Sequence, residues 1–148
     1  MKINYKKIFK KNLLNVLKDV LQNIEEKGLT NNQSLYITFI TNHSKVLIPS
    51  WLKKKYPDEM TIVIQYEYYN LKLRKNNFSI GLSFDNIKTD LTIDYESVIS
   101  FADPEANFGL KFINKELDQS KKRNIKKKSL QTKQKNNIIE FKNYKKIN

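Results

Sequence analysis

The sequence contains no cysteine, and this absence excludes two kinds of stabilisation. Without thiols the chain can form neither disulfide bonds nor thiolate metal sites, so its stability must come from a packed core. That is the usual situation in the reducing cytosol, and we expect a cytoplasmic protein. No apolar run approaches the ~18 residues that a membrane-spanning helix needs, so neither a signal peptide nor a membrane span is predicted.

Glycine and histidine are also scarce, which leaves little material for an active site. Gly28, Gly81 and Gly109 are the only glycines and lie too far apart for a phosphate-binding loop or a dinucleotide fingerprint. The single histidine, His43, has no cysteine or second histidine with which to bind a metal, and we expect it in a solvated loop. We therefore predict no catalytic residue, no metal and no cofactor.

The net charge of +13 raises the question of nucleic-acid binding, and its distribution along the chain bears on the answer. Residues 1–18 carry six lysines and no acid, and residues 119–148 carry eleven basic residues and one glutamate. Residues 19–118, in contrast, contain eleven basic and fourteen acidic residues. A nucleic-acid-binding domain is expected to keep its phosphate-neutralising side chains on the folded surface. Because the excess charge lies on a tail and at one helix start, specific nucleic-acid binding is not favoured.

Two alternatives from other classes stay open. A small β-barrel that binds RNA or the ribosome would fit the basic tail, since such folds commonly bind single strands. A metal-dependent nuclease would have to use the carboxylates of Asp85, Asp90 and Asp94. Their spacing suits solvent-facing turn and edge positions better.

The N-terminal region predicts one long amphipathic helix. Apolar residues recur with helical spacing from Tyr5 to Lys27, and Gly28 suits the position that ends a helix. The apolar face has two interpretations, packing on its own domain or pairing with a second copy across a two-fold axis. In the second interpretation the dimer interface consists of Leu13, Leu17, Val20, Leu21 and Ile24.

The region that follows predicts a small β domain, because it is rich in β-branched and aromatic residues separated by turn residues. Strands are expected at residues 35–41, 46–48, 61–74 (one long strand or a pair), 78–84, 91–95 and 107–112. Short helical pieces are expected at residues 50–55 and 97–101. The predicted class is therefore α+β and mostly β, with an N-terminal helix followed by a mostly antiparallel β domain.

The C-terminal part of the sequence changes character. Residues 113–137 are basic and have too few apolar side chains to offset the entropy of ordering, so we predict a disordered linker. Apolar character returns in residues 138–148, where no domain remains for these side chains to join. This pattern is typical of a short docking motif on a tether. The predicted organisation is thus a folded domain (1–112), a linker (113–137) and a docking motif (138–148).

One predicted strand suggests a peptide-binding strip. In the segment FSIGLSF (78–84) one face carries large apolar side chains, while the other carries only Ser79, Gly81 and Ser83. A glycine inside a strand often marks the close approach of another backbone. Gln65, in the apolar segment MTIVIQY, can donate to and accept from such a backbone. The alternative is that the N-terminal helix covers this face.

Four segments, taken together and in order, resemble the SspB (stringent starvation protein B) family in its α-proteobacterial branch. They are LYITFIT (35–41), YPDEMTIVIQYEYYNL (56–71), FSIGLSF (78–84) and FADPEANFGLKF (101–112). The resemblance spans most of residues 5–112. It implies a homodimeric adaptor without enzymatic activity, which binds ssrA-tagged polypeptides and delivers them to the ClpXP protease. The fold that it implies is a small barrel-like antiparallel β-sandwich behind an N-terminal helix.

The resemblance also implies two sites. The first is a groove for the tag peptide, and we expect it to include Val63, Gln65, Ser79, Gly81 and Ser83. The second is the C-terminal motif, which resembles family tails that dock on the N-terminal domain of ClpX. The docking residues are expected to be Ile138, Ile139, Phe141, Tyr144 and Lys145. Lys142 departs from the family pattern, which has an acid there.

Overall fold

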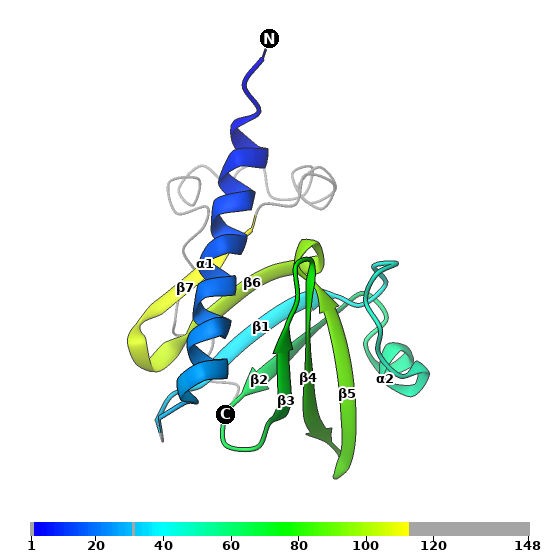
Figure 1. The fold of residues 1–148 in the computed structure, drawn as a ribbon. Helices are drawn as coiled ribbons and strands as arrows, with labels where there is room; N and C mark the ends of the chain where they lie inside the picture. The colour runs from blue at the N-terminus through cyan, green and yellow to red at the C-terminus, as the bar shows by residue number, and fades with distance from the viewer. Residues whose placement is uncertain (1, 31, 113–148) are drawn as a thin grey trace, which may run out of the picture.

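The computed structural model describes residues 2–30 and 32–112 and shows an N-terminal helix followed by two antiparallel sheets (Figure 1). The elements are α1 (Tyr5–Lys27), β1 (Leu35–Ile40), α2 (Ser50–Lys55), β2 (Glu59–Ile64), β3 (Tyr69–Leu73), β4 (Asn77–Phe84), β5 (Ile87–Asp94), β6 (Val98–Asp103) and β7 (Phe108–Lys111). The predicted fold class is confirmed. The predicted linker (113–137) and docking motif (138–148) lie outside the described residues.

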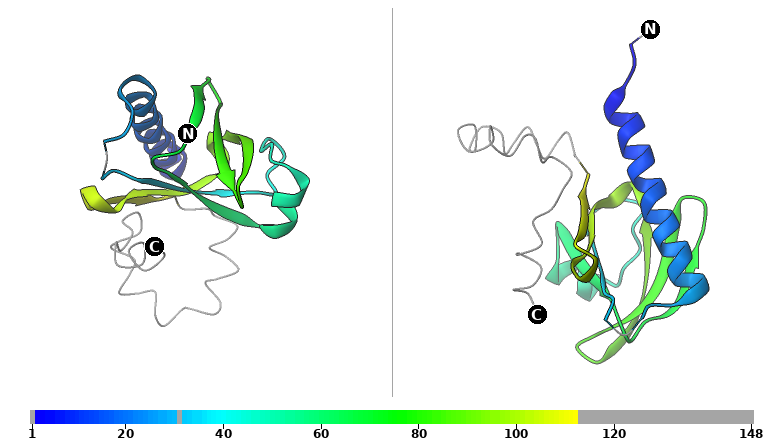
Figure 2. Two further views of the ribbon diagram at one scale, coloured as in Figure 1. Left: turned by 90° about the horizontal axis from the view of Figure 1, so that it is seen from below. Right: turned by 90° about the vertical axis from the view of Figure 1, so that its left-hand side faces the viewer.

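The strands form two sheets that are joined at the β2–β3 and β5–β6 connections. Sheet A has the order β2-β1-β6-β7, and sheet B has the order β3-β4-β5. Seen from below, α1 and sheet B lie side by side over the same face of sheet A (Figure 2). The core fills the space between these three layers, and its largest fully buried side chains include Phe39, Phe78 and Phe101.

Helix α1 begins and ends where the sequence predicted, and both ends have a local cause. The Lys7 amide donates to the Asn4 side chain at 3.1 Å, which satisfies one of the free amides of the first turn. At the other end the Gly28 amide donates to the Ile24 carbonyl at 2.8 Å. Gly28 has a φ of +72°, a conformation that residues with a Cβ rarely adopt.

The apolar face of α1 packs on the chain's own core, and this corrects the predicted dimer interface. Leu17 and Leu21 are 0% exposed, and Leu13 and Ile24 are also buried in the core. These four side chains therefore offer little surface to a second copy. Val20 alone of the predicted five is partly exposed. The most apolar face of α1 packs against the core of the domain, because burial of this face contributes most to the free energy of folding.

The predictions of strands β1 and β4 and of the short helix α2 hold, whereas two other predictions fail. Residues 97–101 were expected to be helical, but most of this segment belongs to β6, which lies between β1 and β7. A β-branched pair, Val98 and Ile99, starts this strand, and pairing on both sides satisfies its backbone. The expected strand at residues 46–48 is reduced to one bridge, between Leu47 and Thr92.

Tyr95 lies in the core beneath α1 with its hydroxyl buried. Its ring packs against that of Phe78, with centroids 5.6 Å apart, and Lys18 lies 4.8 Å from the centre of its ring. The hydroxyl has no hydrogen-bond partner among the described residues. Burial, together with the nearby negative charge of Glu25, raises the pKa of Tyr95 to about 12.

We expect Tyr95→Phe to make the fold more resistant to alkali. Between its ordinary pKa of 10.0 and the folded value of about 12, Tyr95 ionises only in the unfolded chain, so rising pH favours unfolding. The wild-type protein should lose about 2–3 kcal/mol through this group by pH 12, and the variant should not. Tyrosinate absorbance and denaturant unfolding at several alkaline pH values measure both effects. At neutral pH the substitution should change the free energy of unfolding by less than about 1 kcal/mol, because no hydrogen bond is lost. If the free energy of unfolding fell equally with rising alkaline pH in the two proteins, this prediction would be contradicted.

Candidate functional site

Strand β2 lies at one edge of sheet A, and its outer side is free of pairing with another described strand. The outer strands of sheet B, in contrast, form further hydrogen bonds on their outer sides. At β3 the Leu73 amide donates to the Glu25 carboxylate of α1 at 3.3 Å. At β5 Leu47 and Thr92 exchange two backbone hydrogen bonds of 2.9 and 3.0 Å. Strand β2 pairs with β1 on one side, and a groove adjoins its other side. Unpaired backbone groups on such an edge can pair with an extended peptide.

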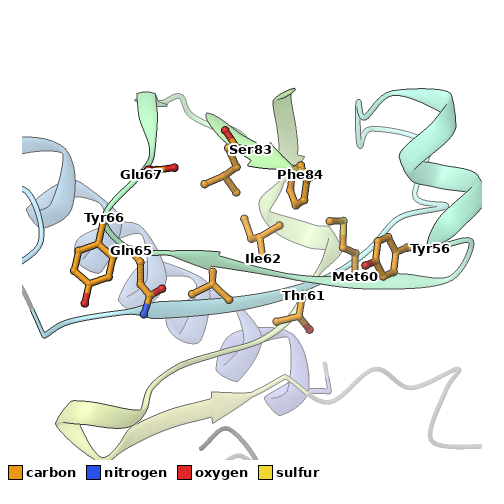
Figure 3. Close-up of a pocket in the computed structure, with 11 residues that line it drawn as sticks. Tyr56, Met60, Thr61, Ile62, Gln65, Tyr66, Glu67, Ser83 and Phe84 are labelled. Carbon is orange, nitrogen blue, oxygen red and sulfur yellow. The ribbon is translucent and has the colours of Figure 1, made fainter. Parts of the chain in front are cut away.

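The groove has a volume of about 440 Å³ and lies between β2 and the end of β4 (Figure 3). It is lined by Tyr56, Met60, Thr61, Ile62, Val63, Gln65, Tyr66, Glu67, Leu82, Ser83 and Phe84. Met60 and Ile62 point from β2 towards Ser83 and Phe84, whereas Thr61 and Gln65 point to the opposite side of the strand. The groove therefore includes side chains from both faces of β2.

One end of the groove is held in place by contacts of α2 and the segment that follows it. The Thr41 hydroxyl, which is buried, donates to the Tyr56 carbonyl at 2.6 Å. Lys55 forms an ion pair of 3.3 Å with Asp85, at the turn that follows Phe84. Both partners are largely exposed, so this pair contributes at most about 1 kcal/mol. Its main effect is to join α2 to the β4–β5 turn at the groove end.

The β4–β5 turn that Lys55 contacts is favoured by the residues that form it. Asp85 and Asn86 have φ values of 51° and 65°, as a two-residue hairpin turn requires, and Asp and Asn tolerate this conformation. Strands β4 and β5 then pair in register from Phe84 with Ile87 to Asn77 with Asp94. This regular hairpin presents Ser83 and Phe84 to the groove.

The groove is more suited to a neutral or cationic ligand than to an anion. Of the described residues that line it, none is cationic, and Glu67 is acidic and exposed. Tyr66 is 75% exposed, so its ring and hydroxyl are available at the open end. Apolar side chains and hydroxyls make up most of the remaining surface.

The structure brings together three of the five residues predicted for the tag site. Val63, Gln65 and Ser83 line the groove, whereas Ser79 and Gly81 do not. The Ser79 hydroxyl accepts a hydrogen bond of 3.2 Å from Arg74.

Gly81 faces the protein's own Tyr69, and this corrects the idea that a foreign backbone approaches the strand there. A Cβ at Gly81 would overlap the Tyr69 ring, so glycine is needed for packing within the chain. Lys88 lies 5.6 Å from the centre of that ring. The strip of small side chains that the strand pattern predicted is therefore covered near Gly81 by the neighbouring strand β3. Only the Ser83 end of this strip is exposed.

Several groove residues were not predicted for the tag site, above all Tyr56, Tyr66 and Glu67. Tyr66 and Glu67 lie in the connection through which the chain passes from sheet A to sheet B. The pattern of residues 61–74 allowed one long strand or a pair, so it did not locate this change of sheet. The position of Tyr56 depends on its contact with Thr41, which is distant in sequence.

The other residues considered for chemistry do not converge. The described residues contain no group of three or more His, Cys, Asp or Glu side chains that could hold a metal. The His43 ring accepts a hydrogen bond from the Lys45 amide in its own loop, at 3.1 Å. Asp94 caps a turn by accepting from the Glu96 amide at 2.8 Å, and Asp85 pairs with Lys55. Nor does any helix in the described part of the chain have the length and apolarity needed to cross a membrane.

Comparison with known proteins identifies the family. A search among curated proteins found no match. The family model described as SspB, stringent starvation protein B, matches residues 7–146, which is nearly the whole chain and includes the tail. The chain therefore belongs to the SspB family, whose members are non-enzymatic adaptors, and this membership implies a role with the ClpXP protease.

Proposed function

We propose that this chain binds an ssrA-type degradation tag as an extended strand along the free edge of β2, and brings it to the ClpX unfoldase through its C-terminal motif. The observation that carries the first half is the groove at an unpaired strand edge. The family match, which extends over the tail, supports the second half. The protein acts in the cytoplasm, without a cofactor.

A peptide paired with β2 would use both sides of the groove. Side chains of an added strand alternate between the two faces of the sheet. On one face they would meet Ile62, Ser83 and Phe84, and on the other they would meet Thr61, Val63 and Gln65. The six residues of β2 offer an edge of about 20 Å. This length suits recognition of a short linear sequence, with backbone pairing for affinity and side-chain contacts for specificity.

The groove chemistry favours a peptide over a nucleic acid. Single-stranded nucleic acid is bound by aromatic side chains together with cations that track the phosphates. The described groove residues provide aromatic rings, but their charged member is Glu67, which repels phosphate. The alternative of an RNA-binding barrel therefore has no support from this site.

Delivery depends on joining two binding events in one molecule. The body holds the tag while residues 138–148 hold the unfoldase, so transfer of the tag becomes effectively intramolecular. Residues 113–137, treated as a coil from their composition, have a root-mean-square span of roughly 25–30 Å. A homodimer would carry two such tails and gain avidity.

A titration of labelled ssrA peptide with the purified protein tests the proposed function, and Gln65→Ala tests the site. We expect saturable binding that survives moderate salt, and about tenfold weaker binding for the variant, because one hydrogen-bonding side chain is lost. Gln22→Ala is the matched control, since Gln22 is exposed on α1 and contacts Glu26. Absence of peptide binding by the folded wild-type protein would refute the proposal. Equal affinities of the wild-type, Gln65→Ala and Gln22→Ala proteins for the peptide would show that Gln65 does not belong to the site.

A further inference from the structure

The first turns of α1 and the residues just before them carry a dense positive charge. Lysines occupy positions 2, 6, 7, 10 and 11, and residues 1–18 contain no acid. Lys10 forms an ion pair of 3.2 Å with Glu96. The other four lysines have no ion-pair partner in the described part of the chain. This segment therefore attracts an anionic partner.

The same turns expose large apolar side chains. Tyr5, Ile8 and Phe9 are 72%, 52% and 46% exposed. Their spacing of three and four residues places them on one side of the helix, and we call them the N-terminal stripe. At roughly 100° per residue, Lys6 and Lys11 flank this stripe on its two sides. An exposed apolar stripe between lysines is the pattern of a helix that lies in the surface of an anionic membrane.

The N-terminal stripe faces away from the rest of the domain. Lys10 lies on the opposite side of the helix, in line with the buried Leu13 and Leu17. Its ion pair with Glu96 shows that this opposite side faces the domain. The first turns of α1 also extend beyond the two sheets (Figure 1). A flat surface can therefore contact the stripe without meeting the sheets.

We propose that the N-terminal stripe and its lysines bind the surface of an anionic lipid bilayer. The three apolar side chains enter the headgroup region, and the lysines bury their aliphatic stems and keep their ammonium groups at the lipid phosphates. The second half of α1 contains Asp19, Glu25 and Glu26, which anionic lipids repel, so the contact is limited to the first turns. No residue that lines the tag groove comes from α1, so a chain on the membrane can still hold a tag. This activity goes beyond the proposed function and gathers the adaptor at a membrane.

A nucleic acid is the other anionic partner that lysines could bind, and the N-terminal stripe favours lipid over it. Nucleic-acid binding uses cations for the phosphates and aromatic rings for the bases. Ile8 provides neither, although it is 52% exposed next to Phe9. The acyl region of a bilayer, in contrast, removes an aliphatic side chain from water.

Co-flotation of the full chain with lipid vesicles tests the proposal. Binding to vesicles of equal parts phosphatidylcholine and phosphatidylglycerol should be at least about tenfold stronger than binding to pure phosphatidylcholine, because the lysines respond to anionic lipid. Two double variants, Lys6→Gln with Lys11→Gln and Ile8→Gln with Phe9→Gln, should each weaken binding to the anionic vesicles by at least about tenfold. Glutamine is a good helix former, so α1 should still form in both.

Matched controls remove the same kinds of side chain elsewhere. Lys53→Gln with Lys54→Gln removes two exposed lysines of α2, and Leu47→Gln with Ile87→Gln removes two exposed apolar side chains. Both controls should bind anionic vesicles as the wild-type protein does. Equal weakening in the controls and in the stripe variants would overturn the proposal. Equal binding of the wild-type protein to neutral and anionic vesicles would also overturn it.

The absence of native cysteine allows insertion to be measured directly. Ile8→Cys, labelled with an environment-sensitive fluorophore, should shift its emission to the blue when anionic vesicles are added. Gln22→Cys, on the second half of α1, should not. Unchanged emission at position 8 would overturn the proposal, and so would emission already shifted before vesicles are added, since another protein surface would then cover the stripe.

Two further titrations assign the partner and separate this inference from the proposed function. Tighter binding of the wild-type chain to a single-stranded oligonucleotide than to anionic vesicles would assign the lysines to nucleic acid and overturn the proposal. The stripe variants should bind ssrA peptide with the affinity of the wild-type protein, because the groove lies outside α1. Loss of tag binding together with vesicle binding would show that the variants damage the fold, and would contradict a separate membrane site.

Discussion

A chain that lacks residues 138–148 is expected to bind ssrA peptide with unchanged affinity and to lose stimulation of ClpXP degradation. The groove lies wholly within residues 56–84 of the folded domain, so removal of the tail leaves it intact. The gain from tethering disappears, and such gains are typically ~10²–10⁴ in apparent affinity. Degradation of a tagged substrate at sub-saturating concentration should therefore fall to the rate seen without adaptor.

Point variants distinguish a docking motif from a general effect of the tail. Phe141→Ala should reproduce much of the loss, because an aromatic anchor is removed from the predicted motif. Lys133→Ala, in the predicted linker, should deliver normally. A truncated chain that still delivers tagged substrate at the full rate would show that docking occurs elsewhere.

Ser83→Tyr is expected to reduce the affinity for the tag by at least about tenfold while leaving the fold intact. Ser83 is exposed at the open end of the strip and lines the groove, so a large ring there occupies the space that the peptide needs. Tyrosine is favourable in strands, and surface substitutions usually change the free energy of unfolding by about 0.5 kcal/mol or less. Peptide titration and denaturant unfolding measure the two quantities separately.

Lys88→Tyr provides the matched control for this substitution. Lys88 is the cross-strand neighbour of Ser83 on β5 and is exposed, but it does not line the groove. The same new side chain should therefore leave tag affinity nearly unchanged. Equal loss in both variants would indicate a general effect on sheet B, and no loss in Ser83→Tyr would place the peptide elsewhere.

The elements that were predicted correctly depend on local interactions. Helix α1 follows from its periodicity, from Asn4 at its start and from Gly28 at its end. The β4–β5 hairpin follows from Asp85-Asn86, which adopts the positive φ values that such turns need. In both cases the deciding contacts join residues that are close in sequence.

The elements that were predicted wrongly depend on distant partners. Residues 98–101 form a strand because β1 and β7 pair with them, and β1 is distant in sequence from this segment. Gly81 suggested an external backbone, but its actual neighbour is Tyr69, which reaches it across the β3–β4 pair. A strand pattern shows which face is bare and does not show what covers it.

By itself, the amino-acid sequence determined the class of the fold, the positions of its local turns, the separation of a basic tail from a near-neutral body, and the resemblance to the SspB family. These properties depend on composition, short-range spacing and segment order. Only the tertiary structure decided that the strip near Gly81 is covered, that the groove lies at the β2 edge, and that the core-facing leucines of α1 are unavailable to a partner. Each of these depends on which distant side chain fills a given space, and packing between layers settles that.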